Sequence, residues 1–310
     1  MESNSLMLLA LLPGILIIFY VYKMDKVEKE PWRLIGKLVL IGMLSCIPTA
    51  LLEGVIDGMM PAWPEGSLPY ALSMAFASAA LCEEICKYVF LRLGVWKNPN
   101  FGYRFDGILY AVSVSVGFAM LENVLYVAQG DLTVALMRGV LTVPLHAFCG
   151  VFMGVFLGAA KKARVEGRGS GKLTVLALFV PMMIHGIYDT LAFLGNGTAT
   201  ILLLAFVLAM YIVSIRCIRS FSADDASSAF YPDTEPFAGQ DKAQQESFSS
   251  YAYGPRGTQT GGQRPHPGQV SDGRIILICP YCRRGLRVPV GAGRIRIRCP
   301  HCGKEFNEIT

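Results

Sequence analysis

The stretch LCEEICKYVF, residues 81–90, decides the fold class and points to a functional site. It lies inside a mostly apolar run, 69–92, and a helix of about 20 apolar residues is long enough to cross a bilayer. Glu83, Glu84 and Lys87 nevertheless stand near the middle of this run. A charge at the bilayer centre costs on the order of 3 kcal/mol, so such residues mostly face a protein interior or an aqueous cavity. The stretch therefore predicts a membrane helix with its charged groups inside a helix bundle.

The composition of the whole chain also indicates a membrane protein. Of 310 residues, 53% are hydrophobic and only 16% are charged, whereas a soluble domain has about 25% charged residues. The apolar runs that are long enough to span a bilayer are 5–22, 34–57, 69–92, 107–128, 132–160, 173–194 and 199–219. We therefore predict an all-α polytopic membrane bundle of about seven transmembrane helices over residues 1–220.

Basic residues are distributed unevenly between the loops. Lys and Arg follow the first, third, fifth and seventh runs, whereas the loops after the second, fourth and sixth runs contain neither. Because basic loops stay on the cytoplasmic side, we expect the N-terminus outside and the C-terminus in the cytoplasm. No basic residue precedes the first run, so we expect a retained anchor rather than a signal peptide.

Ionisable and amide groups deep in the apolar runs form the candidate site. They are Glu83, Glu84, Lys87, Glu122, Asn123, His146, His185 and Asp189. The set includes both histidines of the membrane region, since His266 and His301 lie in the tail. His185 and Asp189 are four residues apart and share one helix face. With helices in alternating directions, these groups have similar depth, and we expect them to converge on one cavity.

Several chemical interpretations fit this set. In the first, a carboxylate acts as general base on water while the imidazoles stabilise the oxyanion or protonate the leaving amine. In the second, His146, His185 and one or two carboxylates bind a catalytic Zn²⁺ that keeps an open position. In the third, the acids and histidines form a proton or cation pathway. A structural alternative is that the groups only pair with one another and hold the bundle together.

The polar tail divides into a linker and a small metal-binding module. Residues 221–272 are rich in Ser, Gly, Gln and Pro, which is typical of a flexible linker. Residues 273–310 contain CPYC and CPHC, which supply Cys279, Cys282, Cys299 and Cys302. Two C-x-x-C pairs at this spacing predict a structural zinc site in a small β zinc ribbon, with RIRIR (294–298) as a strand. Two disulfides are the alternative, which a cytoplasmic location disfavours.

The predicted ribbon is strongly basic. Residues 273–310 contain eight Lys or Arg and two acidic residues. Such a surface suits a cytoplasmic protein, nucleic acid or anionic lipid as a partner.

Four short motifs follow one another along the membrane segments. EEICK (83–87) fits E-E-x-x-K, FAMLEN (118–123) fits F-x-x-x-E-N, HAFCG (146–150) fits H-x-x-x-G, and HGIYD (185–189) fits H-x-x-x-D. DKVEKEPW (25–32) resembles a juxtamembrane signature of the same proteins. In this order, over residues 5–219, the motifs resemble the PrsW family of bacterial intramembrane proteases, which is related to the CAAX-processing and bacteriocin-immunity membrane endopeptidases.

This resemblance implies a multi-pass protein of the bacterial cell (inner) membrane. It implies a glutamate-dependent, metal-free endopeptidase that cuts membrane-anchored, single-span proteins, including anti-sigma factors in envelope-stress signalling. An intramembrane zinc metalloprotease and a non-catalytic sensor or proton or ion transporter are the alternatives.

Roles for individual residues follow from the same motifs. We expect Glu83 to be the water-activating base, with Glu84 assisting it. His146 and His185 would stabilise the oxyanion or donate a proton, and Asp189 would orient His185 or a neighbouring group. Glu122 stands where the related CAAX enzymes have a histidine, and it would orient His146 or a water molecule. Lys87 would act as a structural counter-ion, with Asn123 as a further supporting residue.

Overall fold

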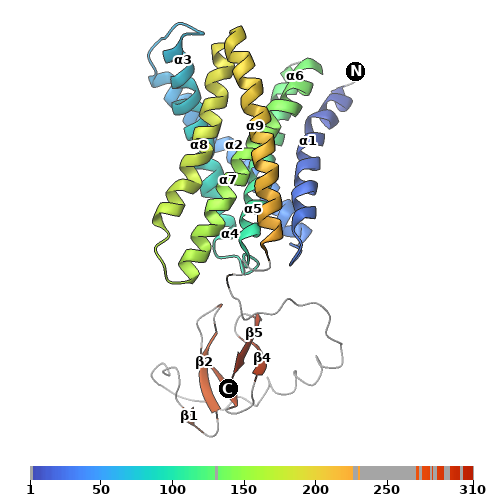
Figure 1. Ribbon diagram of the computed structural model, residues 1–310, viewed down its shortest axis with the longest axis vertical. Coiled ribbons are helices and arrows are strands. Elements are labelled where there is room, and N and C mark those ends of the chain that lie inside the picture. Colours follow the sequence, from blue (N-terminus) through green and yellow to red (C-terminus); the bar gives the residue numbers. More distant parts are fainter. Residues whose placement is uncertain are drawn as a thin grey trace. The chain divides into compact units, whose positions relative to one another are not determined.

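The computed structural model describes residues 3–129, 132–225, 230, 270–271, 274–279, 281, 285–289, 294–300 and 303–309. The chain divides into two compact units, Met1–Phe230 and Tyr231–Thr310. The first unit is helical and the second contains short strands (Figure 1). Most of the predicted linker, 221–272, lies outside the described residues.

The first unit is a bundle of helices that follow the apolar runs of the sequence. The α-helices are α1 (Ser3–Met24), α2 (Trp32–Met59), α3 (Leu68–Leu72), α4 (Leu81–Val95), α5 (Arg104–Gln129), α6 (Leu132–Met137), α7 (Val143–Val165), α8 (Gly171–Leu194) and α9 (Gly197–Ala223). Two π-helical segments, η1 (Ser73–Ala80) and η2 (Arg138–Thr142), continue α3 into α4 and α6 into α7. The helices extend past the apolar runs because backbone hydrogen bonding continues through flanking polar residues.

Within the described part of the chain, five helical stretches are long and apolar enough to cross a membrane: Trp32–Met59, Arg104–Ala128, Leu132–Val165, Gly171–Leu194 and Gly197–Ala223. The other two predicted spans are helical too. The apolar helix Ala10–Met24 is shorter, and the run 69–92 is divided between α3, η1 and the charged helix α4. The protein is therefore mostly helical with five candidate spans, and the total of seven and the orientation stay predictions.

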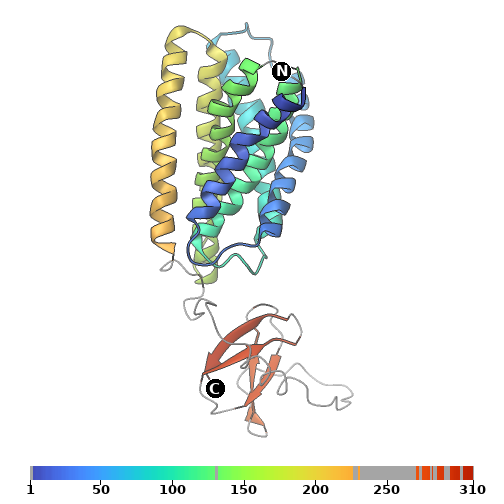
Figure 2. The ribbon, with the colours of Figure 1, turned by 90° about the vertical axis from the view of Figure 1, so that its right-hand side faces the viewer.

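Helix α5 occupies the centre of the bundle. In the most apolar part of α5, 78% of the residues are buried, compared with 17% in the corresponding parts of α2 and α9. α5 packs against α7, α2 and α1, whereas α2 and α9 lie on opposite outer sides (Figure 2). The outer helices expose large apolar side chains such as Leu51 and Ile201, which suits contact with lipid rather than water.

Small residues let the backbones of α5 and α7 touch. A Cβ atom on Gly154 would lie 2.3 Å from the carbonyl oxygen of Gly107, and one on Gly150 would lie 2.9 Å from the Cα atom of Val112. Such distances exclude a side chain at either glycine unless the helices separate. α5 and α7 run antiparallel. His146 lies one turn before Gly150 on α7, so it faces the part of α5 that follows Val112.

The turn between α1 and α2 contains buried acidic side chains. Burial raises the pKa of Asp25 to about 6 and, acting with the nearby Asp25, that of Glu30 to about 7. The Asn100 side-chain amide donates a hydrogen bond to Glu30 Oε2 at 3.4 Å, and the Ser222 hydroxyl donates one to the Met24 carbonyl oxygen at 2.5 Å. Asp25 and Glu30 therefore pack against the bundle, whereas Lys26, Glu28 and Lys29 of the same turn are exposed.

The second unit contains two small antiparallel sheets. β1 (Val270–Ser271), β2 (Arg274–Ile278) and β3 (Gly285–Pro289) form one sheet, and β4 (Arg294–Arg298) pairs with β5 (Glu305–Ile309) in the other. The strand predicted at RIRIR is confirmed as β4. Cys279 and Cys299 are buried and directly follow β2 and β4. Cys282, His301 and Cys302 lie outside the described residues, so the zinc ribbon stays a prediction.

Candidate functional site

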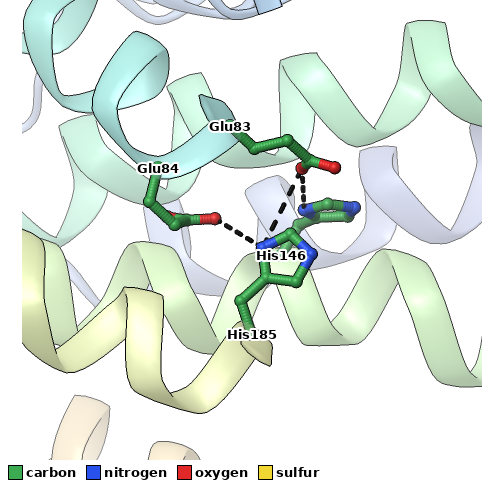
Figure 3. Close-up of side chains that lie close together, drawn as sticks. All are labelled: Glu83, Glu84, His146 and His185. Atoms are coloured by element: carbon green, nitrogen blue, oxygen red, sulfur yellow. Dashed lines mark hydrogen bonds and ion pairs between the residues drawn. The ribbon is translucent and has the colours of Figure 1, made fainter. Parts of the chain in front are cut away.

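Two carboxylates and two imidazoles from three helices face one another inside the bundle. Figure 3 shows Glu83 and Glu84 on α4, His146 on α7 and His185 on α8. One possible ligand atom from each residue lies within 4.8 Å of those of the other three, and all four residues are buried. The structure thus brings together groups that are up to 102 positions apart, as from Glu83 to His185.

Lys87 is the central cation of this cluster. Its Nζ atom donates hydrogen bonds to Glu83 Oε2 at 2.8 Å and to Glu84 Oε1 at 2.9 Å. It lies 2.9 Å from His146 Nδ1 and 4.1 Å from the centroid of the Phe118 ring. Since Lys87 has no exposed surface, these contacts replace the hydration of its ammonium group.

Each imidazole also contacts a second carboxylate through its far nitrogen. His146 Nε2 lies 3.0 Å from Glu122 Oε2 on α5, and His185 Nε2 lies 3.1 Å from Asp189 Oδ2 one turn along α8. An ionised carboxylate only accepts hydrogen bonds, so each Nε2 atom carries a proton. The Nδ1 atoms face the centre of the cluster, where His185 Nδ1 lies 2.9 Å from Glu84 Oε1.

The cluster suits a divalent cation by its donors and its charge. Two histidines with one or two glutamates are a donor set of catalytic zinc sites, and carboxylates on the far imidazole nitrogens are typical of zinc-binding histidines. The carboxylates Glu83, Glu84, Glu122 and Asp189 outnumber the contacting cations Lys87 and Arg138 by four to two. Both nitrogens of His185 face carboxylate oxygens, so this imidazole is also a cation and the net charge is −1. Lys87 Nζ contacts three of the atoms that could bind a metal: Glu83 Oε2, Glu84 Oε1 and His146 Nδ1. A bound metal would replace Lys87 in these contacts.

The acids differ in their exposure. The Glu84 side chain is fully buried, whereas the side chains of Glu83, Glu122 and Asp189 are 8%, 21% and 16% exposed. Of the two central glutamates, Glu83 is therefore the more accessible.

Asn123 does not join the central cluster. Its side-chain amide donates a hydrogen bond to the Ala10 carbonyl oxygen of α1 at 2.8 Å, and its Oδ1 atom accepts one from Arg138 Nε at 3.1 Å. It therefore links α5 to two neighbouring helical segments.

Two contributing residues were missed by the sequence analysis. Arg138 forms an ion pair with Glu122, with 3.0 Å between Nη2 and Oε2. It is the only Lys or Arg between residues 105 and 160, a signal that would have identified it. Glu53 on α2 interacts electrostatically with Glu83 and Glu122. Interfacial acids such as Glu53 are common, so its sequence position carried no comparable signal.

Comparison with known proteins identifies the family. The protein-family model described as PrsW family intramembrane metalloprotease matches residues 30–215 of the chain. Protease PrsW of Halalkalibacterium halodurans is 31% identical over 215 residues, which cover 69% of this chain and 96% of the relative. Protease PrsW of Geobacillus kaustophilus and of Bacillus subtilis are each 34% identical, over 60% and 57% of this chain and 79% and 78% of the relatives. No solved structure matches the chain. The chain therefore belongs to the PrsW family of intramembrane proteases.

Proposed function

We propose that the Glu83, Glu84, His146 and His185 cluster is the peptidase centre of this protein. It would hydrolyse a peptide bond of a membrane-anchored, single-span protein, with anti-sigma factors as one substrate class. The observation that carries the proposal is the convergence of two acids and two imidazoles within 4.8 Å inside a bundle whose outer helices are apolar. If the cluster only held the helices together, ion pairs would be sufficient. That role would not require two histidines that are each oriented by a second carboxylate.

Glu83 is the better placed of the two glutamates to act as the base. Its side chain is partly accessible, whereas Glu84 is fully buried between Lys87 and His185. In the proposed step, Glu83 takes a proton from water as the water oxygen bonds to the peptide carbonyl carbon. The proton then passes to the amine as the C–N bond breaks. Glu84 holds Lys87 and His185 in place during these transfers.

The imidazoles act at the other side of the reacting carbonyl group. His146 and His185 lie with their ring centroids 5.3 Å apart and come from two different helices. Their rings are oriented by Glu122 and Asp189, so little reorganisation is needed when charge develops on the carbonyl oxygen. We assign them to stabilising that oxygen or to returning the proton to the leaving amine.

The family description favours the zinc alternative over the metal-free mechanism that the sequence resemblance suggested. In that case Glu84, His146 and His185 would hold the metal, in place of the imidazole roles given above, and Glu83 would remain the base. A bound Zn²⁺ would polarise the peptide carbonyl group and lower the pKa of a water molecule. Glu122 and Asp189 would accept the Nε2–H hydrogen bonds of the two histidines. The Nδ1 atoms would then carry no proton and could bind the metal.

Metal removal tests this assignment. We expect a chelator to abolish cleavage of a single-span substrate by the purified full chain in lipid nanodiscs, and added Zn²⁺ to restore it. The experiment uses the Cys279→Ser/Cys299→Ser variant, so that metal in the tail does not contribute. Chelator-resistant cleavage with no metal bound at the membrane site would support the metal-free glutamate mechanism and overturn the zinc assignment.

We further propose that residues 273–310 bind structural zinc through Cys279, Cys282, Cys299 and Cys302. Support comes from the two described cysteines, which are buried at the ends of β2 and β4. Gly303, with φ of 73°, closes a turn in which its N–H donates to the Cys299 carbonyl oxygen at 2.8 Å. The basic strands would present this module to a cytoplasmic protein, nucleic acid or anionic lipid.

Zinc content measures the ribbon proposal directly. We expect the full chain to lose one zinc ion per molecule when Cys279 and Cys299 are both replaced with Ser, because two of four ligands do not retain zinc. Deleting 273–310 should leave membrane insertion intact. An unchanged zinc content in the double variant, measured by mass spectrometry of the metal, would contradict the proposal.

A further inference from the structure

Glu53 on α2 is a half-buried acid beside the cluster. Its charge acts on Glu83 of α4 and on Glu122 of α5, so it lies where these three helices meet. Within the described part of the chain, its carboxylate forms no hydrogen bond and no ion pair. An ionised carboxylate in an apolar helix is costly unless it is paired, and such a residue usually serves function. The fold alone therefore does not explain Glu53.

The cations of the cluster are engaged with other acids. Lys87 Nζ donates a hydrogen bond to Glu83 Oε2 at 2.8 Å, and Arg138 Nη2 forms an ion pair with Glu122 Oε2 at 3.0 Å. Glu53 adds a further negative charge beside two acids that already share these cations. Because like charges repel, the substrate-free chain has no electrostatic need for a carboxylate at this position.

The part of α2 that follows Glu53 has an open surface. The last buried residue of this helix is Thr49, and Met59 is 80% exposed. A Cβ atom added to Gly54 or to Gly58 would meet no neighbouring atom within 4 Å. α2 lies at the outer edge of the bundle (Figure 2). A second apolar helix can therefore lie along residues 50–59, and the two glycines allow its backbone to approach closely.

We propose that residues 50–59 of α2 are a docking surface for the membrane span of the substrate, and that Glu53 pairs there with a Lys or Arg of that substrate. The inference rests on the proposed function for the identity of the occupant. A basic side chain supplies the cation for Glu53, because its long apolar stem packs on the helix while its charged end reaches the carboxylate. Since the charge of Glu53 acts on Glu83, the basic residue would lie close to the bond that is cut.

A basic side chain explains Glu53 better than a metal ion does. Within the part of the chain that the structure describes, the four residues whose ligand atoms gather within 4.8 Å do not include Glu53. Asp57, one turn further along the same face of α2, is exposed and attracts an approaching cation as well. An acidic substrate would be repelled at both positions, so this surface discriminates between substrates by charge.

Binding of synthetic single-span peptides measures this preference without turnover. The peptides share one span of Leu and Ala and carry Lys, Gln or Glu at a single position, which is moved along the span. The full chain in lipid nanodiscs carries Glu83→Gln, so that the peptides are not cut. At the matching position we expect the Lys peptide to bind about 10-fold more tightly than the Gln peptide, the usual effect of a hydrogen bond to a charged group. Equal binding of the three peptides at every position would overturn the proposal.

Substitutions of Glu53 identify the residue that causes the preference. Glu53→Gln should abolish the difference between the Lys and Gln peptides, and Glu53→Lys should make the Glu peptide bind most tightly. The matched control is Glu65→Lys, the same change at an exposed position between α2 and α3, which should keep the original order. A preference for Lys that persists in Glu53→Gln would assign it to another acid and overturn the role of Glu53.

Thermal unfolding separates a binding role from a structural one. Because the charge of Glu53 is unpaired, Glu53→Gln should have a Tm equal to or above that of the wild type in the absence of peptide, as for residues retained for function. A lower Tm would show that Glu53 supports the fold and would contradict the inference.

Kinetics distinguish this inference from the proposed function. With a substrate that carries the basic residue, Glu53→Gln should raise KM about 10-fold and leave kcat within about twofold of wild type. A loss confined to kcat would place Glu53 in the chemical step and overturn the docking role. If Glu83→Gln still cleaved substrate, the proposed function would fail, whereas the order of peptide binding would still decide the role of Glu53.

Discussion

Replacing Glu83 with Gln is expected to lower the rate of substrate cleavage by about 10²–10⁴-fold, the usual contribution of a general base. The amide has nearly the same shape as the carboxylate, and its oxygen retains the hydrogen bond from Lys87 Nζ, now 2.8 Å. The folded structure should therefore survive while the group that accepts the proton is lost. The measurement is kcat/KM of the purified full chain in nanodiscs with a single-span substrate.

The matched control is Glu65→Gln, which makes the same chemical change at an exposed position between α2 and α3. Its activity should equal that of the wild type. Glu84→Gln should also reduce activity, through the loss of the charge that pairs with Lys87 and His185. A Glu83→Gln protein with wild-type activity, next to an inactive Glu84→Gln protein, would reverse the roles of the two glutamates.

Replacing Lys87 with Met is expected to destabilise the metal-free protein by about 3–5 kcal/mol, the usual cost of removing one partner of a buried ion pair. Methionine fills a similar volume but leaves Glu83 and Glu84, four and three residues before it, without their shared cation. Thermal unfolding in detergent, with chelator present, should show a correspondingly lower Tm.

A second substitution identifies the cause of this loss. Lys87→Met/Glu84→Gln should recover part of the stability, because one of the two unpaired charges is removed. Lys97→Met, at an exposed position beyond α4, should leave the Tm nearly unchanged. Equal Tm values for wild type and Lys87→Met would show that Lys87 is not the counter-ion of the glutamates.

Hydropathy and helical spacing predicted the parts of the site that lie on single helices. The pair His185 and Asp189 follows from a spacing of four residues, and Glu83, Glu84 and Lys87 follow from charges within one apolar run. Their convergence with His146 was predicted from depth alone. The depth of these residues in the membrane was sufficient for the prediction, because polar groups in several apolar helices are stable only where they face one another.

Contacts that depend on helix rotation could not be predicted in the same way. Whether Glu122 touches His146, and whether Asn123 faces the site or α1, depends on the register between α5 and α7. That register follows from backbone contacts such as Gly154 against Gly107, which no single-helix pattern contains. Arg138 is different, since its place as the only Lys or Arg between residues 105 and 160 would have identified it.

The proposed cleavage of single-span membrane proteins by the buried cluster can be tested in cells. The most direct measurement compares the N-terminal peptides of membrane proteins from cells that contain the wild-type protein with those from cells that contain Glu83→Gln at equal abundance. We expect new termini within or beside the membrane spans of particular proteins in the wild type, and their disappearance in the variant. Identical termini in both samples under envelope stress, with both proteins folded, would contradict it and favour a sensor or ion pathway instead.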